Sequence, residues 1–309
     1  MLVNKALITA KVETTYGTDA VPTGATNSIL CEEPTVEALE SKVERANIKP
    51  NYGAQRFVSI GEGLKISFTV ELKGSGTAGT APEIGALLRG CNFTETIQAA
   101  VSVTYLPNSS QAGESLSLYY YADGMLHKIL GARGTFSVAQ GTVNQYVKLK
   151  FEFTGLYAGP AALALATPTF NAAVPPVWRN AQFTLDAYAA VLNSLTFDIG
   201  NSIAKRTSLN SATGILEWYV SERSVKGEFD PEMVLPATYD FWGKWQSGGA
   251  YPLTATIGSA AGNRCVITAP AVQLDMPKYD KRETTLTAKI PLVFAPTSAG
   301  NDEIQLLFN

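Results

Sequence analysis

The residues whose types could support chemistry are few and widely spaced. His127 is the single histidine among 309 residues, so a Ser–His–Asp or Cys–His catalytic group would depend on this one side chain. Cys31, Cys91 and Cys265 lack Cys-x-x-Cys spacing, and we expect them to be buried free thiols. We therefore predict no catalytic residues, and a His127 that is structural or faces solvent.

Metal and cofactor motifs are also missing from the sequence. The Gly-rich segment 74–79 lacks the Lys-Ser/Thr of a P-loop and the spacing of a dinucleotide-binding loop, so we interpret it as a flexible turn. Three acidic pairs lack the loop geometry of a calcium site and suit solvated strand ends: Glu32–Glu33, Asp230/Glu232 and Asp275/Asp280. We predict that the protein is not an enzyme and holds no metal or cofactor.

Composition narrows the class of protein further. Lys and Arg number 24 against 27 Asp and Glu, a net charge of −3, which argues against a sequence-reading nucleic-acid binder. Hydrophobic residues make up 46% and charged residues 17%, with 26 Gly and 16 Pro, a mixture typical of a β-rich chain with many turns. No apolar run is long enough to span a membrane, and Lys11 and Glu13 interrupt any signal-peptide core. We expect synthesis in the cytoplasm.

Alternating apolar and polar residues predict most of the secondary structure. In Leu64–Leu72, Leu64, Ile66 and Phe68 alternate with Lys65 and Ser67, which indicates a strand with one buried face. Further strands are predicted at 116–121, 125–130, 135–138, 146–153, 192–199, 215–220, 225–229, 253–257, 265–268, 272–274 and 285–292. Helix signals occur only at 82–89, which is aliphatic, and at 238–245, where Trp242 and Trp245 favour core packing over sugar stacking.

Three segments lack a core-forming pattern. Residues 1–29 are rich in turn chemistry and are interpreted as an N-terminal arm, with a short strand at 6–12 as an open alternative. The segment Ser41–Ser59 is polar between two strands, and 200–214 is a second polar stretch. Loops this long are usually functional or disordered, so we expect the arm and the first of these loops to be ordered by neighbouring subunits.

The second half of the chain repeats the pattern of the first. Val147, Leu149, Phe151 and Phe153 match Leu286, Ala288, Ile290 and Leu292 in order and phase. We therefore predict a mainly β fold of two β-sandwich units, each with one flanking helix, that arose by internal duplication. The predicted boundaries are an arm at 1–29, a first unit at 30–160, an Ala/Pro-rich linker at 161–176 and a second unit at 177–309.

The opening half resembles the major tail tube proteins of long-tailed, non-contractile bacteriophages. The resemblance is carried by 11–24, by 68–79, by Ala81–Gly90 and by Leu118–Gly124, in this order. It is clearest over residues 5–160. It implies a structural virion protein, a β-sandwich with a flanking helix, whose copies form stacked rings around a channel for genomic DNA.

The resemblance also implies partners and a location. The partners would be other copies of the chain, the tape measure inside the tube, the tail terminator and the distal tail or baseplate. DNA would pass without specific binding, no membrane would be involved, and the location would be the virion tail. Two units in each chain favour a ring of three copies with pseudo-sixfold symmetry, and a ring of six remains an alternative.

The residues expected at the contact between rings lie in the arm and the polar loops: Tyr16, Arg45, Lys49, Tyr52, Arg56, Lys205 and Arg206. A different class of function is also compatible with a β-rich chain. It is a carbohydrate-binding or adhesive β-sandwich of the tail tip or baseplate.

Overall fold

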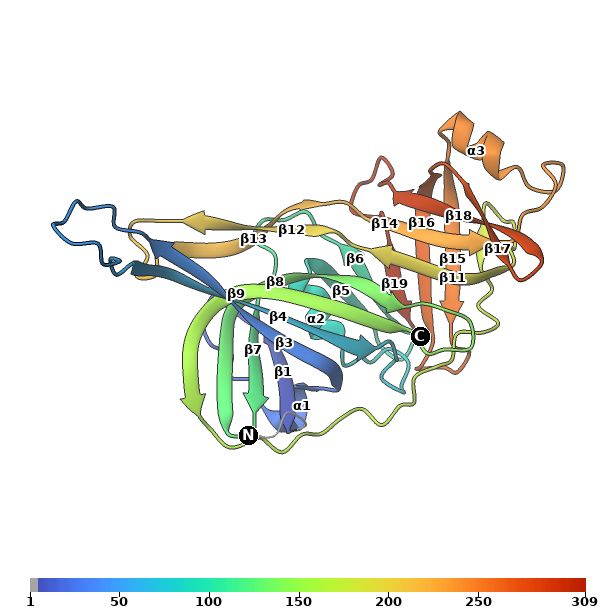
Figure 1. The fold of residues 1–309 in the computed structure, drawn as a ribbon. Helices are drawn as coiled ribbons and strands as arrows, with labels where there is room; N and C mark the ends of the chain where they lie inside the picture. Colours follow the sequence, from blue (N-terminus) through green and yellow to red (C-terminus); the bar gives the residue numbers. More distant parts are fainter. Residues whose placement is uncertain (1–4) are drawn as a thin grey trace.

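Antiparallel strands form most of the chain, and every pairing between named strands is antiparallel (Figure 1). The computed structural model describes residues 5–309, with the backbone alone for residues 40, 41, 61 and 62. The mainly β fold predicted from the alternating pattern is confirmed.

The elements of the first half are β1 (Ala6–Val12), α1 (Gly24–Asn27), β2 (Ser28–Ile29), β3 (Cys31–Val43), β4 (Val58–Glu71), α2 (Gly85–Gly90), β5 (Phe93–Gln98), β6 (Ser102–Pro107), β7 (Leu116–Ala122), β8 (Met125–Gln140) and β9 (Lys148–Ala162). Those of the second half are β10 (Thr184–Leu185), β11 (Leu192–Asp198), β12 (Asn201–Thr207), β13 (Ile215–Arg223), β14 (Lys226–Pro231), α3 (Phe241–Ser247), β15 (Ala250–Ile257), β16 (Cys265–Leu274), β17 (Lys278–Arg282), β18 (Thr285–Phe294) and β19 (Gln305–Phe308).

The two halves share one pairing order. In the first half the strands pair in the order β1–β7–β8–β9–β4–β3. In the second half they pair in the order β10–β15–β16–β18–β14–β11. A helix follows the corresponding strand in each half, α2 after β4 and α3 after β14. The β5–β6 hairpin has no counterpart in the second half.

Strand pairing joins the halves at two places. Ser137 of β8 pairs with Asp198 of β11 at the edge where the first half meets the second. On the other side, β19 lies between β16 and β6 and pairs with both. The halves are therefore connected through continuous sheet as well as through the chain itself.

The core is continuous across both halves. Phenylalanine rings of the first half stack inside it, with Phe68 and Phe151 centroids 6.1 Å apart. Phe136 meets Phe197 of the second half edge-on at 6.4 Å. Phe229 and Phe241 belong to the same buried cluster, so strand β14 and helix α3 pack onto it together. This shared core fixes how the two halves face each other.

The predicted strands and both predicted helices are present, with three differences. The pairs of strands predicted at 125–130 and 135–138, and at 265–268 and 272–274, are the single strands β8 and β16. The stretch 200–214, predicted as polar loop, contains β12, which pairs only with β13. That hairpin packs little of either face on the core, so its sequence has no reason to alternate. The short strands β5, β6, β17 and β19 were also not predicted.

The N-terminal segment differs from the expected arm. Residues 6–12 are β1, which pairs with β7 over its full length, and Leu7, Ile8 and Ala10 are buried. The prediction of little core-forming pattern is wrong here because four successive residues of β1 are buried on both faces of the sheet, which removes the alternation. The linker segment 161–176 is mostly exposed beyond Ala162, where β9 ends. The boundary between two units stays a prediction.

The burial of β1 leads to a first prediction. Replacing Ile8, which is fully buried, by Ala should lower the free energy of unfolding by about 2–5 kcal/mol, because a cavity opens in the core. The control is Lys11→Ala on the same strand, where the side chain is exposed and the change should be within about 0.5 kcal/mol. Urea unfolding of the soluble subunit measures both. Equal stability of the two variants would mean that β1 is a loose arm in solution.

Candidate functional site: two protruding hairpins

The first hairpin is the extension of β3 and β4 beyond the core. The two strands stay paired out to Val43 and Val58, and residues 44–57 connect them (Figure 1). Ile48 and Tyr52 at its tip are completely exposed, at 103% and 109%. One hydrogen bond holds the loop internally, from Gln55 Nε2 to the carbonyl of Asn47 at 2.8 Å. The hairpin thus presents two large side chains that its own subunit does not cover.

The first hairpin is also positively charged. Residues 44–57 contain Arg45, Lys49 and Arg56 against a single acid, Glu44. Arg45 and Arg56 are exposed and Lys49 is half-buried, and among the described side chains none of the three makes an ion pair. Cations without local partners keep their full attraction for an acidic surface, subject to screening by salt.

The second hairpin is β12–β13, which forms a small sheet of its own. Lys205 and Arg206 on β12 are exposed, and Arg206 reaches Glu217 across the hairpin at 3.2 Å. An ion pair this exposed contributes little stability, about 0–1 kcal/mol. Leu209 in the connecting turn is fully exposed at 106%. Like the first hairpin, this one has an apolar side chain at its tip and basic residues along its length.

The base of the second hairpin is anchored to the first half by Tyr16 and Arg133. The Tyr16 hydroxyl accepts a hydrogen bond from the backbone N–H of Trp218 at 2.7 Å. The buried guanidinium of Arg133 donates to the carbonyl of Trp218 at 2.9 Å and to that of Gly113 at 2.7 Å. Both backbone groups of Trp218, on β13, are therefore bonded to the first half.

The ring of Tyr16 fills the space above a glycine. Gly131 has a φ of +61°, and a Cβ added there would lie 2.5 Å from the Tyr16 ring. The Arg133 guanidinium lies 5.2 Å from the centroid of the same ring, within the range of a cation–π contact. Burial raises the pKa of Tyr16 to about 12 and lowers the pKa of Arg133. Tyr16 therefore stays a neutral phenol at physiological pH.

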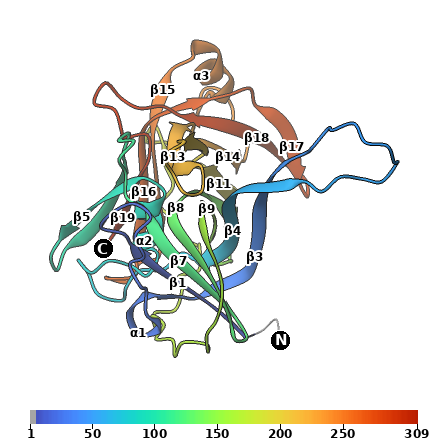
Figure 2. The same cartoon turned by 90° about the vertical axis from the view of Figure 1, so that its left-hand side faces the viewer.

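The two hairpins leave the same end of the molecule. Figure 1 shows both extending to the left, and Figure 2, which views that end, shows the tip of the first hairpin displaced to one side of the second. They touch at their bases, since a Cβ on Gly63 of β4 would lie 2.9 Å from Cζ2 of Trp218. One end of the subunit therefore carries both.

Six of the seven residues predicted for the contact between rings lie on these hairpins, and Tyr16 lies at the base of the second. That these residues contact a neighbouring ring stays a prediction. Sequence reasoning missed Trp218 and Arg133 at the base, and Ile48 and Leu209 at the tips. The signal for the last two was present: each is a large apolar residue inside a polar loop.

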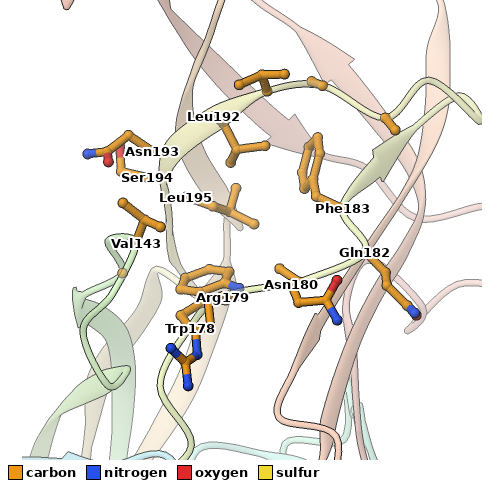
Figure 3. Close-up of a pocket in the computed structure, with 15 residues that line it drawn as sticks. Val143, Trp178, Arg179, Asn180, Gln182, Phe183, Leu192, Asn193, Ser194 and Leu195 are labelled. Carbon is orange, nitrogen blue, oxygen red and sulfur yellow. The ribbon is translucent and has the colours of Figure 1, made fainter.

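The best-defined pocket lies where the two halves meet and has little capacity for chemistry. It measures about 300 Å³ and is lined by Trp178, Phe183, Leu192 and Leu195, with Arg179 as its one charged residue (Figure 3). Figure 3 shows Leu192, Leu195 and Phe183 around the same hollow. Trp178 is itself almost fully buried, so its ring is not a platform for a sugar.

The other residues considered for chemistry have structural surroundings. His127 stacks between the rings of Tyr120 and Tyr157, with each centroid 6.1 Å away. Cys91 and Cys265 are buried free thiols as predicted, and Cys31 is half-buried. Within residues 5–309 no group of three or more His, Cys, Asp or Glu side chains could hold a metal ion. No described helix combines the length and apolar character needed to cross a bilayer.

The two tryptophans of the second helix have different roles. Trp245 packs against the core, as predicted. Trp242 instead contacts Tyr279 of β17, donating from its indole N–H to the tyrosine hydroxyl at 3.1 Å with the ring centroids 5.5 Å apart. Helix α3 is thereby tied to strand β17 as well as to the core.

The anchor of the second hairpin gives a second prediction. Tyr16→Phe leaves the N–H of Trp218 without its acceptor, which should lower the free energy of unfolding by about 1 kcal/mol and speed hydrogen exchange across 201–223. Because the folded pKa of Tyr16 exceeds that of an ordinary tyrosine, its contribution is complete below pH 10 and lost as the pH approaches 12. The matched control is Tyr52→Phe, at a fully exposed ring. Identical exchange in both variants would contradict the anchor.

The comparisons with known proteins identify the family of the chain. The sequence matches the phage tail tube protein family over residues 3–305, nearly the whole chain. A comparison with individual curated proteins gives no match. The matched family is a structural one, found in the virion tail, and its match extends across both halves and both hairpins. The chain belongs to the phage tail tube protein family.

Proposed function

We propose that this chain polymerises into stacked rings that form the tail tube of a long-tailed, non-contractile phage, a conduit for genomic DNA during ejection. The observation that carries the proposal, beside the family, is the repeated pairing order of the two halves. A subunit made of two equivalent units, each with a projecting hairpin at one end, suits a ring that must stack on an identical ring.

An internal duplication explains the repeated pairing order. β4 and β14 each pair with one strand before the hairpin and one later strand, and the later strands, β9 and β18, carry the matched apolar residues. The hairpins also correspond: the β3–β4 extension and β12–β13 each interrupt the same connection. Equal topology with low sequence identity is what a diverged duplication leaves.

Three copies complete a ring of six units in this proposal. The halves have diverged, with an aliphatic α2 and an aromatic α3, as expected if each unit meets unlike neighbours. A ring of six copies would need twelve units, or would need the second unit to lie outside the sheet that the first continues. The continuous sheet between β8 and β11 supports the smaller ring, because both units already share one sheet.

The solvent face of this sheet suits a channel that does not bind DNA. On this face two lysines share one carboxylate: Glu152 accepts from Lys65 at 2.7 Å and from Lys150 at 3.0 Å. These two lysines lower the pKa of Glu152, with the hydrogen bond from Lys65 as the largest cause, so it stays ionised. Paired charges release few counterions on meeting phosphates, and DNA would therefore slide past.

If the chain forms a tube, the other tail proteins that it contacts are determined by the inside and the two ends of that tube. The tape measure would lie inside it, and the tail terminator and the distal tail or baseplate would meet its two ends. The subunit would be made in the host cytoplasm and end in the virion tail. The proteins at the two ends would bind the surfaces through which rings stack on one another, because these surfaces are exposed on a terminal ring.

Charge reversal on the first hairpin tests the stacking role. The triple variant Arg45→Glu, Lys49→Glu, Arg56→Glu should remain folded and form rings but lose tubes, because cations that meet acidic groups of the next ring would become repulsive. The matched control, Arg45→Lys, Lys49→Arg, Arg56→Lys, keeps the charge and should polymerise. Negative-stain microscopy scores tubes and rings. Tubes of normal length from the reversed variant would rule out these cations as the contact.

The mass of a single ring tests the number of copies. Three copies of the 33.0 kDa chain give about 99 kDa, and we expect rings of that mass by native mass spectrometry, with a six-lobed outline in axial view. Rings with six copies would refute the trimer while leaving the tube itself in place. A chain that forms neither rings nor tubes at any concentration would refute the proposed function.

A further inference from the structure

The edges of β3 and β17 are among the strand edges that have no partner within the described chain. β3 pairs only with β4, although it is 13 residues long, and β17 pairs only with β18. An open edge exposes backbone N–H and C=O groups that can pair with another chain. Both edges belong to the sheets that the two halves share, and they lie at opposite ends of the strand order.

The junction inside the chain shows how one unit meets the next. The outer edge of β8 is divided: β7 covers its first part, and β11 meets its last part with Ser137 opposite Asp198. The contact continues past the end of β8, where the N–H of Val143 donates to the carbonyl of Asn193 at 2.8 Å. A unit therefore meets its successor through the end of one strand and the first strand of the next unit.

β16 and β17 together pair with β18 in the second half as β8 pairs with β9 in the first half. β15 covers the outer edge of β16, as β7 covers the first part of β8. β17 pairs with β18 on the same side as β16 does. The opposite side of β18 is occupied by β14 and, beyond it, by the Glu232–Thr287 bridge. In the second half, however, no strand meets the outer edge of β17. The counterpart of β11 is missing there.

β3 is the strand equivalent to β11. Each lies beside the strand that carries the central phenylalanine of its half, and each sets an acid against a lysine: Glu37 opposite Lys65, and Asp198 opposite Lys226. The open edge of β3 is therefore the missing counterpart for the open edge of β17.

We propose that β17 of one copy pairs antiparallel with β3 of a neighbouring copy, with Lys278 opposite Glu37. The register follows from the pairings inside each half. Ser137 pairs with Lys150 and Lys278 pairs with Lys289, which are equivalent positions of β9 and β18. The inference rests on the proposed ring, and it names the contact that closes it.

Exposure supports this contact. Tyr279 is 61% exposed, whereas Val138, its equivalent on β8, is 9% exposed. Leu286 is 53% exposed, whereas its equivalent Val147 is 1% exposed. In the first half these positions are covered within the subunit. In the second half the same apolar positions are open, as expected when their cover comes from another copy.

In the proposed register the charges of the two strands are complementary, and the paired side chains lie on the same face of the sheet. Lys278 and Glu37 both lie on the solvent face, and neither makes an ion pair among the described side chains. Tyr279 and Val36 would then be opposite each other on the core face, where Val36 already packs. A slip of one residue would set Lys278 opposite Val36 or Ala38 instead of Glu37 and would lose the charge pair.

Paired cysteines test the contact directly. In a Cys31→Ser background, Glu37→Cys with Lys278→Cys should give covalent trimers after mild oxidation of assembled tubes, because directly opposite residues lie within disulfide reach. Thr35→Cys with Lys278→Cys is the control. It moves one cysteine two residues along the same face, beyond comfortable reach, and should cross-link about fivefold less.

The outcomes separate this inference from the proposed function. Covalent trimers on a non-reducing gel support the pairing. Tubes that give no cross-link, or only a link within one chain, overturn the pairing but leave the tube in place. A wild-type chain that forms no rings or tubes overturns both.

Charge exchange covers the case in which the cysteine variants fail to fold. Glu37→Lys and Lys278→Glu should each raise the concentration needed for ring assembly about two- to fivefold, because like charges then oppose each other across the strands. The double exchange Glu37→Lys with Lys278→Glu should restore it. A double variant no better than either single one overturns the pairing.

Discussion

The open strand edge is the constraint on which the rest of this structure depends. Each backbone N–H and C=O at an edge needs a partner, and a soluble monomer usually protects such edges by bulges, charges or covering loops. Here the edge of β8 is met inside the chain by β11, with Ser137 opposite Asp198, while the edges of β3 and β17 are left open. In the proposed ring, these outer edges would be the ones that other copies cover.

The second hairpin is held in place by hydrogen bonds to the rest of the chain, because β12–β13 has no sheet partner there. Asn201 and Arg223 bind the first half at its base. Tyr16 and Arg133, 202 and 85 residues away, bind the backbone of Trp218 farther along it. The desolvation of Arg133 is offset by two carbonyls, by the ring of Tyr16 and by the carboxylate of Glu217, which lies 3.7 Å from the guanidinium. A hairpin held this way keeps its tip free, because none of the anchoring groups lies near Leu209.

The sequence predicted the fold class well and the assembly surfaces only in part, for a physical reason. Strands with one buried face, such as Leu64–Leu72, have an alternating pattern that can be recognised, and the capped helices have local start and stop signals. β1 is buried on both faces and β12 on almost neither, so both lack the alternation and were interpreted as arm and loop. β17 is a five-residue edge strand of mostly charged residues, without an alternation of apolar and polar side chains to mark it. Tyr16 was selected for its place in a turn, while its contact with Trp218 depends on tertiary structure that no local pattern contains.

Charge is distributed differently on the surfaces that would face DNA and those that would face protein. On the sheet, Lys65 and Lys150 share the carboxylate of Glu152, and Arg282 is held by Asp230 at 2.9 Å in the second half. On the first hairpin, by contrast, Arg45, Lys49 and Arg56 have no such partners among the described side chains. A tube needs both properties at once: a channel that attracts phosphates weakly, because paired charges leave little net field, and ends that attract an identical ring strongly and specifically. One chain with a net charge of −3 can satisfy both only by separating them in space, and the hairpins achieve this by carrying the unpaired cations away from the sheet.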